Sequence, residues 1–271
     1  MFPLLGRGLT ASGMMRRPVR LGLALSGGVA LGLAHVGVLQ VLDQKNISVS
    51  AIAGTSMGAI VGALYAGGIP SDWLEKLAKR IRWRHVTRVI FPRQGIVGTE
   101  RIELLLDTLL RGRTFDQLQI PLAVVAVDLL MGREVVLREG RVAPAVRASS
   151  AIPGIFPPVE MGDMVLADGG IVNNVPVRPA RDMGCDVVVA VDVGGRRRRS
   201  RPRNLWETML ISMEISQRLQ VDRQLKLADV VIRPDLSGLS PLGLHQAEEM
   251  IARGREAALE KIEEIEALLR E

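Results

Sequence analysis

The chain has 271 residues, of which 48% are hydrophobic and 24% charged, a composition typical of a globular protein with one substantial core. Aromatic residues make up only 3%, which argues against the stacking surfaces of proteins that bind single-stranded nucleic acid. Because Cys185 is the only cysteine, an internal disulfide and a thiolate metal cluster are excluded, and we expect a cytoplasmic protein.

The N-terminal segment differs from the rest of the chain, and we expect residues 1–18 to be a disordered leader before a single domain at 19–271. The segment has no apolar stretch long enough for a signal peptide, and its basic residues follow its short apolar start. Two later spans without charged residues, 21–42 and 46–71, are long enough to form a membrane hairpin. Glycine-rich turns interrupt both, and turn backbone is costly in hydrocarbon. We therefore interpret each span as a buried strand followed by a helix.

Strand and helix patterns alternate from the start of the domain. Apolar runs ending in glycine predict strands at 19–26 and 49–54, and helical patterns follow them at 32–45 and 57–67. Further helical patterns occupy 71–83, 99–111, 204–226 and 245–270. Further strands are predicted at 120–130, with a hairpin neighbour at 133–140, and at 164–170, 185–195 and 228–235. This order indicates an α/β three-layer sandwich with a mainly parallel central sheet.

The sequence GTSMG at 54–58 joins a predicted buried strand to a predicted helix. Small residues at Gly54 and Gly58 permit the strained strand-to-helix turn that exposes a serine hydroxyl, here that of Ser56. The free N–H groups and positive end of the following helix favour a developing oxyanion, so the Met57 N–H is a candidate donor. A bare Gly-x-Ser-x-Gly pattern occurs by chance, but its position between strand and helix favours a nucleophile.

A second glycine-rich turn, SGGVALG at 26–32, ends the first predicted strand. Consecutive backbone N–H groups in such a turn form a cradle for negative charge. A dinucleotide-binding loop is the alternative, but the third position of Gly-x-Gly-x-x-Gly is Val29, and no acidic residue closes the second strand. An oxyanion loop that works with the Ser56 turn accounts for both glycine-rich segments with one site.

A serine nucleophile needs a group that accepts its proton, usually a histidine. The three histidines are His35, His85 and His245, and isolated histidines in such settings are usually surface or core residues. Only His245 would complete the chain order serine, acid, histidine of the α/β-hydrolases.

Aspartates that end predicted strands are the other candidates for this proton acceptor. Asp168 is followed by two glycines, which allows its side chain to project over the carboxyl edge of the sheet, where ligands of open α/β sheets bind. Asp128 and Asp192 occupy similar strand ends without the glycine turn, and we interpret both as structural. Asp168 is therefore the preferred partner of Ser56.

Taken in order, the glycine-rich loop, GTSMG and DGG at 168–170 resemble the patatin-like phospholipases, which use a Ser–Asp dyad. The resemblance extends to GLAHVGVL at 32–39, AVRASSAIPGIFPPV at 145–159 and NNVPV at 173–177. It covers residues 20–195 well and the rest of the chain loosely. The combined motifs are more specific than any one of them alone.

The resemblance implies a role for each matching residue. Ser56 is the expected nucleophile and Asp168 the expected proton acceptor. The expected oxyanion hole comprises Gly27, Gly28, Val29 and Met57. The remaining motif positions are Gly32, Gly54, Gly58, Gly169 and Gly170.

Two positions depart from the family pattern Gly-Gly-Gly-x-Arg/Lys-Gly. The third glycine is replaced by Val29, and a β-branched residue tolerates a positive φ poorly, so we expect a differently shaped cradle. The basic residue is replaced by Leu31, which cannot supply a cation. Both changes bear on catalytic strength and substrate choice more than on the fold.

The resemblance implies a serine acyl hydrolase of the lipase, phospholipase A or lysophospholipase type, with lipid acyl esters as substrates and no metal or cofactor. An acyltransferase is the nearest enzymatic alternative, since the same acyl-enzyme could pass its acyl group to an alcohol or thiol. A lipid-binding or regulatory protein with little turnover is the alternative from another class. The sequence leaves head group, acyl length and oligomeric state open.

The net charge of +6 is concentrated in GGRRRRSRPRN at 194–204. A solvated loop is the ordinary interpretation of such a run. The more specific interpretation is a contact with anionic lipid head groups or with nucleic-acid phosphates. The low aromatic content disfavours the nucleic acid. We expect a peripheral contact with an anionic membrane and no nucleic-acid partner.

Overall fold

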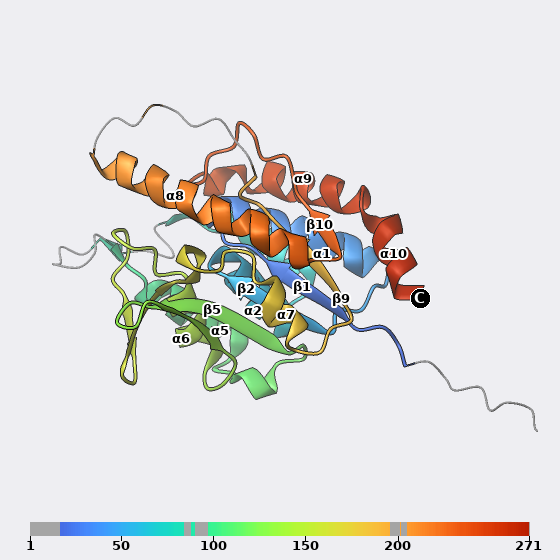
Figure 1. The fold of residues 1–271 in the computed structure, drawn as a ribbon, viewed down its shortest axis with the longest axis horizontal. Coiled ribbons are helices and arrows are strands. Elements are labelled where there is room, and N and C mark those ends of the chain that lie inside the picture. The colour runs from blue at the N-terminus through green and yellow to red at the C-terminus, as the bar shows by residue number, and fades with distance from the viewer. Residues whose placement is uncertain (1–16, 84–87, 90–96, 196–200, 202–204, 271) are drawn as a thin grey trace, which may run out of the picture.

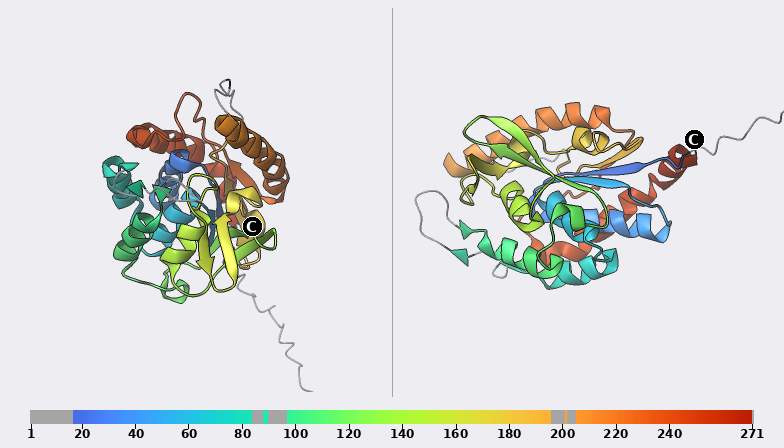
Figure 2. Two further views of the ribbon diagram at one scale, coloured as in Figure 1. Left: turned by 90° about the vertical axis from the view of Figure 1, so that its left-hand side faces the viewer. Right: turned by 90° about the horizontal axis from the view of Figure 1, so that it is seen from below.

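The computed structural model describes residues 17–83, 88–89, 97–195, 201 and 205–270 (Figure 1). Almost all of the predicted leader and most of the arginine-rich run therefore lie outside the described residues. The described chain forms three layers, a central sheet between two layers of helices, as predicted (Figures 1 and 2). No helix within these ranges is both long and apolar enough to cross a bilayer.

The central sheet has eight strands in the order β10-β9-β1-β2-β5-β8-β7, with β6 also paired to β5. Their bounds are β1 Leu21–Leu25, β2 Ala51–Thr55, β5 Leu122–Asp128, β6 Arg133–Leu137, β7 Val159–Met161, β8 Met164–Asp168, β9 Val187–Val191 and β10 Val230–Ile232. The strands from β10 to β5 run parallel, and β6, β8 and β7 run antiparallel to their neighbours. β1, β2, β5 and β9 are buried along their whole length, because helices cover both faces of the sheet.

The helices divide between the two faces (Figure 2). Their bounds are α1 Ala34–Gln44, α2 Met57–Ala66, α3 Ser71–Arg80, α5 Glu100–Leu110, α6 Val142–Ser149, α7 Val177–Arg181, α8 Leu205–Gln224, α9 Ala247–Leu259 and α10 Ile262–Arg270. α1, α2, α3, α5 and α9 contribute to the main apolar core, and α7 and α8 pack over a second, smaller cluster on the other face. A separate two-stranded pair, β3 Arg88–Val89 with β4 Val97–Gly98, lies outside the central sheet.

Several short elements were not expected from the sequence. The short helices α6 and α7 and the strand β7 are too brief to show a periodic apolar pattern. The helix expected at 245–270 is two helices, α9 and α10, separated at 260–261. The helix expected at 32–45 is preceded by a 3₁₀ turn, η1 Val29–Leu33, which belongs to the glycine-rich loop.

Two strands reach the same edge of β5 from opposite directions. β2 pairs with β5 as far as Thr55 opposite Val125, and β8 pairs with it as far as Asp168 opposite Ala126. β6 pairs with residues 124–128 of the same strand, so it occupies the other edge. β2 and β8 therefore lie end to end, and their last residues face adjacent positions of β5. The strand that carries Asp168 is antiparallel to β5, and its last residue reaches the carboxyl end of β2, so Asp168 lies at the edge of the sheet where its side chain was expected.

Candidate active site

Ser56 lies in the turn between β2 and α2, in a conformation that side-chain-bearing residues seldom adopt. Its φ is 53° and its ψ is −121°, a strained region for any residue other than glycine. The Ser56 N–H donates to the Ser149 hydroxyl at 2.9 Å, and that hydroxyl donates to the Val125 carbonyl at 2.6 Å. The turn is thereby tied to α6 and β5. Sequence reasoning gave Ser149 no role, because its contact spans 93 residues.

The two glycines that flank Ser56 have no space for a side chain. A Cβ atom at Gly54 would lie 2.7 Å from the backbone nitrogen of Ala59, and one at Gly58 would lie 2.2 Å from the Leu25 carbonyl oxygen. The start of α2 therefore passes against β1 and β2 at backbone contact distance. This close approach is what the sequence predicted for the positions before and after the serine.

Asp168 ends β8 and begins a short 3₁₀ turn, η3 Gly169–Ile171. Its Oδ1 atom accepts the Gly170 N–H at 2.8 Å. The Ser56 side chain lies close enough to stabilise the ionised carboxylate and lower its pKa. A Cβ at Gly169 would lie 2.3 Å from the Val125 carbonyl oxygen, so the glycine lets this turn press against β5. The end-to-end arrangement of β2 and β8 thus brings the two candidate catalytic side chains into contact.

Both side chains are nearly excluded from water, with 6% of Ser56 and 8% of Asp168 exposed. Burial disfavours the charged carboxylate and raises the pKa of Asp168 to about 6, although the Ser56 side chain and the hydrogen bond from Gly170 oppose this rise. Asp168 is therefore a stronger base than an exposed aspartate and still largely ionised at neutral pH. A buried carboxylate with such a pKa can accept the proton of a hydroxyl group that contacts it.

The glycine-rich loop lies beside this pair. The Gly27 N–H donates to the Asn174 carbonyl at 3.2 Å, so Gly27 is not a free oxyanion donor, contrary to expectation. Within the described part of the chain, no hydrogen bond uses the N–H of Gly28, Val29 or Met57. These three groups remain the candidates for binding an oxyanion.

Packing connects the loop to the Ser56 turn. A Cβ at Gly32 would lie 2.5 Å from the Met57 Cγ, and one at Gly28 would lie 2.4 Å from a methyl carbon of Val193. Val29 adopts a positive φ of 51°, a conformation that β-branched residues tolerate poorly, so the backbone of the loop is strained at this position. Leu31 is buried and lines a hollow together with Arg233, and it supplies no charge to the site.

None of the described histidines contacts Ser56. His35 is fully buried, its Nε2 lies 2.8 Å from the Ser26 carbonyl oxygen, and burial lowers its pKa to about 4. His35 is therefore neutral at neutral pH, and it donates to the residue that begins the glycine-rich loop. His245 is exposed in a 3₁₀ turn, η5 Leu244–Gln246, and His85 lies outside the described residues.

The other two strand-end aspartates have the structural surroundings that the sequence indicated. Asp128 accepts the Leu130 N–H at 3.1 Å and lies 3.6 Å from Arg133. Asp192 forms ion pairs with Arg218 at 2.7 Å and Arg233 at 3.1 Å. Neither carboxylate has a hydrogen bond to Ser56 among the described contacts. In the described ranges, no three His, Cys, Asp or Glu side chains gather as metal ligands would.

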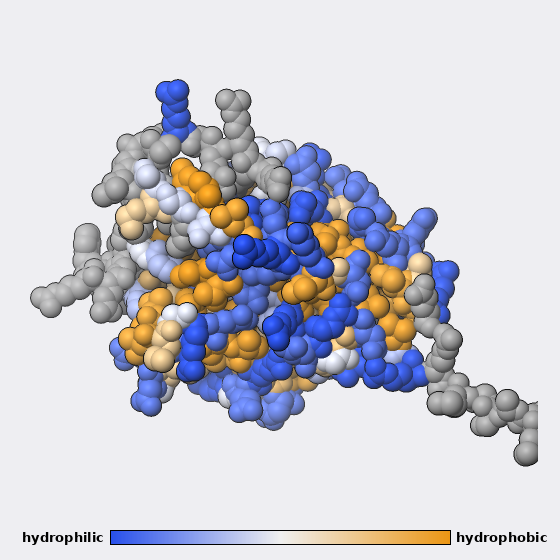
Figure 3. All heavy atoms as spheres, in the orientation of Figure 1, coloured by the Kyte–Doolittle hydropathy of each residue, from blue (hydrophilic) through white to orange (hydrophobic). Residues whose placement is uncertain are grey.

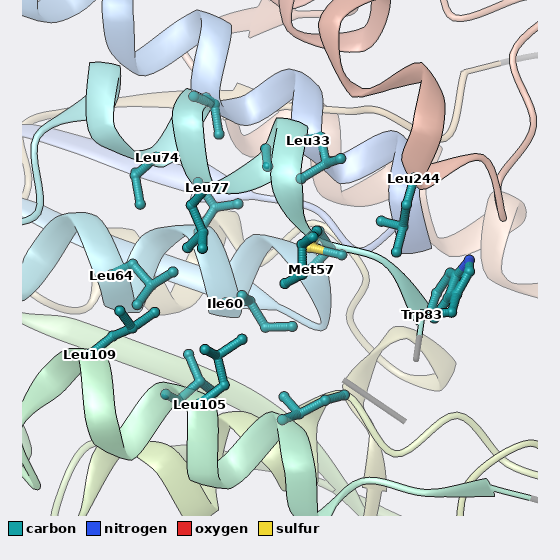
Figure 4. Close-up of a pocket in the computed structure, with 16 residues that line it drawn as sticks. Leu33, Met57, Ile60, Leu64, Leu74, Leu77, Trp83, Leu105, Leu109 and Leu244 are labelled. Carbon is teal, nitrogen blue, oxygen red and sulfur yellow. The ribbon is translucent and has the colours of Figure 1, made fainter. Parts of the chain in front are cut away.

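An apolar cavity begins beside the Ser56 turn (Figure 4). Met57, Ile60, Val61 and Leu64 line it from α2 with helical spacing, so it follows one face of that helix away from the turn. Its other walls come from η1, α3, α5 and residues 81–83, with Leu33, Leu74, Leu77, Leu105, Leu109 and Leu244 among the lining residues. Sequence reasoning missed the cavity, because its walls come from segments far apart in the chain.

Comparison with known proteins identifies the family. The family model for patatin-like phospholipase matches residues 23–181, more than half of the chain. An uncharacterized NTE family protein of Mycobacterium tuberculosis is 38% identical over 179 residues, which cover 65% of this chain and 49% of the relative. Lysophospholipase NTE1 of Cryptococcus neoformans is 31% identical over 183 residues, which cover 65% of this chain and 11% of the relative. The chain thus matches about half the length, or less, of these relatives.

Solved structures share the fold at low sequence identity. VipD from Legionella pneumophila aligns with 91% of this chain and 67% of its own at a TM-score of 0.55 and 14% identity. The type III effector ExoU of Pseudomonas aeruginosa aligns with 91% of this chain and 53% of its own at a TM-score of 0.53 and 17% identity. At this identity the likeness concerns the arrangement of helices and strands.

Proposed function

The chain belongs to the patatin-like phospholipase family, and from this premise we propose that it is a serine acyl hydrolase acting on lipid esters through Ser56 and Asp168. The observation that carries the proposal is the pair formed by Ser56 and the buried Asp168 carboxylate, which the adjoining ends of β2 and β8 bring together. It lies beside three backbone N–H groups that no other described residue uses. A nucleophile, a base and oxyanion donors in one place are the requirements of acyl transfer.

In the first half of the reaction, Ser56 Oγ attacks the ester carbonyl while Asp168 accepts the hydroxyl proton. The N–H groups of Gly28, Val29 and Met57 stabilise the negative charge that develops on the carbonyl oxygen. The tetrahedral intermediate collapses with cleavage of the ester C–O bond. Protonated Asp168 returns its proton to the departing alcohol, and the acyl group stays on Ser56.

In the second half, a water molecule attacks the acyl-enzyme and Asp168 accepts its proton. Collapse of the second intermediate breaks the bond to Ser56 Oγ, which recovers the proton and releases a carboxylic acid. Asp168 therefore serves as base twice and as acid twice. A pKa of about 6 suits both roles, because a group titrating near working pH gives up a proton nearly as readily as it accepts one.

The apolar cavity is the proposed site for the acyl chain. Met57 has a backbone N–H that would bind the oxyanion and a side chain that lines the cavity, so the cavity begins where the acyl carbon would lie. From Met57 to Leu64 it follows eight residues of α2, or about 10 Å for the seven steps between them at 1.5 Å each. A wall of this length and chemistry suits the chain of a phospholipid or lysophospholipid better than the acyl group of a small polar ester.

The proposal is tested by incubating the protein with phospholipid, lysophospholipid, acylglycerol and aryl esters in water enriched in ¹⁸O. We expect free fatty acid carrying one ¹⁸O atom from at least one lipid class, and none from the Ser56→Ala variant. Transfer of the acyl group to an added alcohol without ¹⁸O incorporation would favour an acyltransferase. A folded protein that cleaves no ester in the panel would contradict the proposal and favour a lipid-binding role.

A further inference from the structure

Three consecutive large apolar side chains are exposed at the tip of the β5–β6 hairpin. The exposed fractions are 46% for Leu129, 65% for Leu130 and 69% for Met131. Elsewhere in the described chain, exposed large apolar residues do not occur as consecutive neighbours. Figure 3 shows, for one face, that orange apolar surface is repeatedly interrupted by blue polar surface. A run of three apolar residues exposed to water lowers the solubility of a protein unless a binding partner or a lipid surface covers it.

The hairpin holds this tip in a defined shape. Its two strands pair at five positions, from Val124 opposite Leu137 to Asp128 opposite Arg133. The Leu130 N–H donates to the Asp128 carboxylate at 3.1 Å, and the Leu129 N–H donates to the Val165 carbonyl at 2.8 Å. These bonds fix the backbone on both sides of the tip, and the apolar side chains remain exposed.

The tip lies close to the candidate active site. Asp168 faces Ala126 of β5, and the tip begins three residues further along the chain. At about 3.3 Å per residue, it begins about 10 Å from that position. The Asn173 side chain also donates to Glu134 of the hairpin at 2.8 Å, and the Asn173 carbonyl accepts the Thr55 hydroxyl beside Ser56 at 2.9 Å. The hairpin and the site thus belong to one bonded unit.

We propose that Leu129, Leu130 and Met131 insert into the interfacial layer of a lipid surface and hold the Ser56 site against it. This inference rests on the proposed function, because a lipid hydrolase must meet its substrate at such a surface. Three side chains at a narrow tip are too few for a stable protein interface, which takes about 800 Å² from each partner. The adjacent Arg133 side chain is 62% exposed, although its Nε lies 3.6 Å from the Asp128 carboxylate. A basic side chain beside an apolar tip can reach the lipid head groups while the apolar residues enter the layer below them.

The test uses co-sedimentation with vesicles of phosphatidylcholine and phosphatidylglycerol. The variant Leu129→Ser/Leu130→Ser/Met131→Ser removes the apolar tip. The matched control Leu227→Ser/Leu259→Ser changes two exposed leucines elsewhere, of which Leu227 precedes β10 at the opposite edge of the sheet. We expect the tip variant to bind vesicles at least about tenfold more weakly than wild type, because it loses three buried apolar side chains, and the control to bind like wild type.

Activity separates docking from chemistry. The tip variant should cleave a soluble short-chain aryl ester at the wild-type rate and lose about tenfold on vesicle lipid. Ser56→Ala should bind vesicles like wild type and cleave neither substrate. If wild type binds vesicles through the tip yet hydrolyses nothing, the proposed function fails and the docking surface stands.

A fluorescent label on the tip gives a second measurement that needs no loss of function. Leu130→Cys in a Cys185→Ala background carries an environment-sensitive fluorophore, since Cys185 is otherwise the only thiol. We expect a blue shift and protection from aqueous quenchers when vesicles are added. An unchanged emission spectrum, or equal vesicle binding by wild type and the tip variant, would overturn the proposal.

Discussion

The turns that follow β2 and β8 place the two candidate catalytic groups by different physical means. At Ser56 the backbone is strained, with a φ of 53°, and Gly54 and Gly58 leave no space for other side chains. At Asp168 the backbone is relaxed, with a φ of −53° and a ψ of 124°. The unfavourable free energy there comes from a carboxylate that is removed from water. One group is positioned by backbone geometry, and the other is tuned by desolvation.

This difference predicts that replacing the two side chains has different effects on the free energy of unfolding. Replacing the Ser56 side chain leaves the strain in place, because the turn is held by backbone contacts and by Ser149. Replacing the Asp168 carboxylate removes the charge whose burial opposes folding. Both changes should abolish catalysis, but only the second should alter stability in a pH-dependent way.

The largest expected effect is on turnover. Ser56→Ala and Asp168→Asn should each lower kcat/KM for an aryl ester by roughly 10³-fold or more, because each removes a group required in the transition state. The double variant should be little worse than either single one, since the two groups act as a unit. Circular dichroism would establish that all three proteins are folded. Retention of most activity by Asp168→Asn would contradict the account.

The next effect concerns the strained turn alone. Ser149→Ala removes the acceptor of the Ser56 N–H and should lower kcat by about 10²-fold with little change in KM, because it misplaces the nucleophile rather than the substrate. Ser150→Ala is the matched control, since the buried Ser150 hydroxyl has no hydrogen-bond partner among the described residues. Equal kinetics for the two variants would show that Ser149 does not position the turn.

A smaller effect should follow from loosening the oxyanion loop. His35→Phe removes the hydrogen bond to the Ser26 carbonyl while keeping a ring in the core, and should lower kcat about tenfold by displacing donors of the loop. His245→Phe changes an exposed residue and should leave kcat unchanged. If His245→Phe were the inactive variant of the two, a histidine triad would replace the Ser–Asp pair.

The smallest expected effect is on stability. The folded-state pKa of Asp168 is raised from 3.8 to about 6, so its ionisation opposes folding as the pH rises through this range. Asp168→Asn should therefore unfold at a higher temperature than wild type at pH 8, by up to about 3 kcal/mol in unfolding free energy, and should lose that advantage below pH 4. Thermal unfolding at both pH values checks this. An advantage independent of pH would show that burial of the charge is not its origin.

The parts of the fold that the sequence predicted depend on local signals. The apolar runs of β1, β2, β5 and β9 and the glycines around Ser56 act through nearest neighbours, so they can be identified without tertiary information. The direction of β8 cannot be identified in this way, because an apolar run has the same sequence pattern in a parallel and in an antiparallel strand. Local signals also do not show which N–H groups of the loop are hydrogen-bonded, because the Gly27 N–H donates to Asn174, which is distant in the sequence.

The pH dependence of Ser56 reactivity tests the central claim most directly. A fluorophosphonate probe would be used to measure the second-order rate of Ser56 labelling between pH 4 and pH 9, with mass spectrometry to locate the adduct. The account predicts a rate that rises with an inflection near pH 6, falls by about 10³-fold in Asp168→Asn and is unchanged in His245→Phe. A pH profile and rate in Asp168→Asn equal to those of wild type would contradict it.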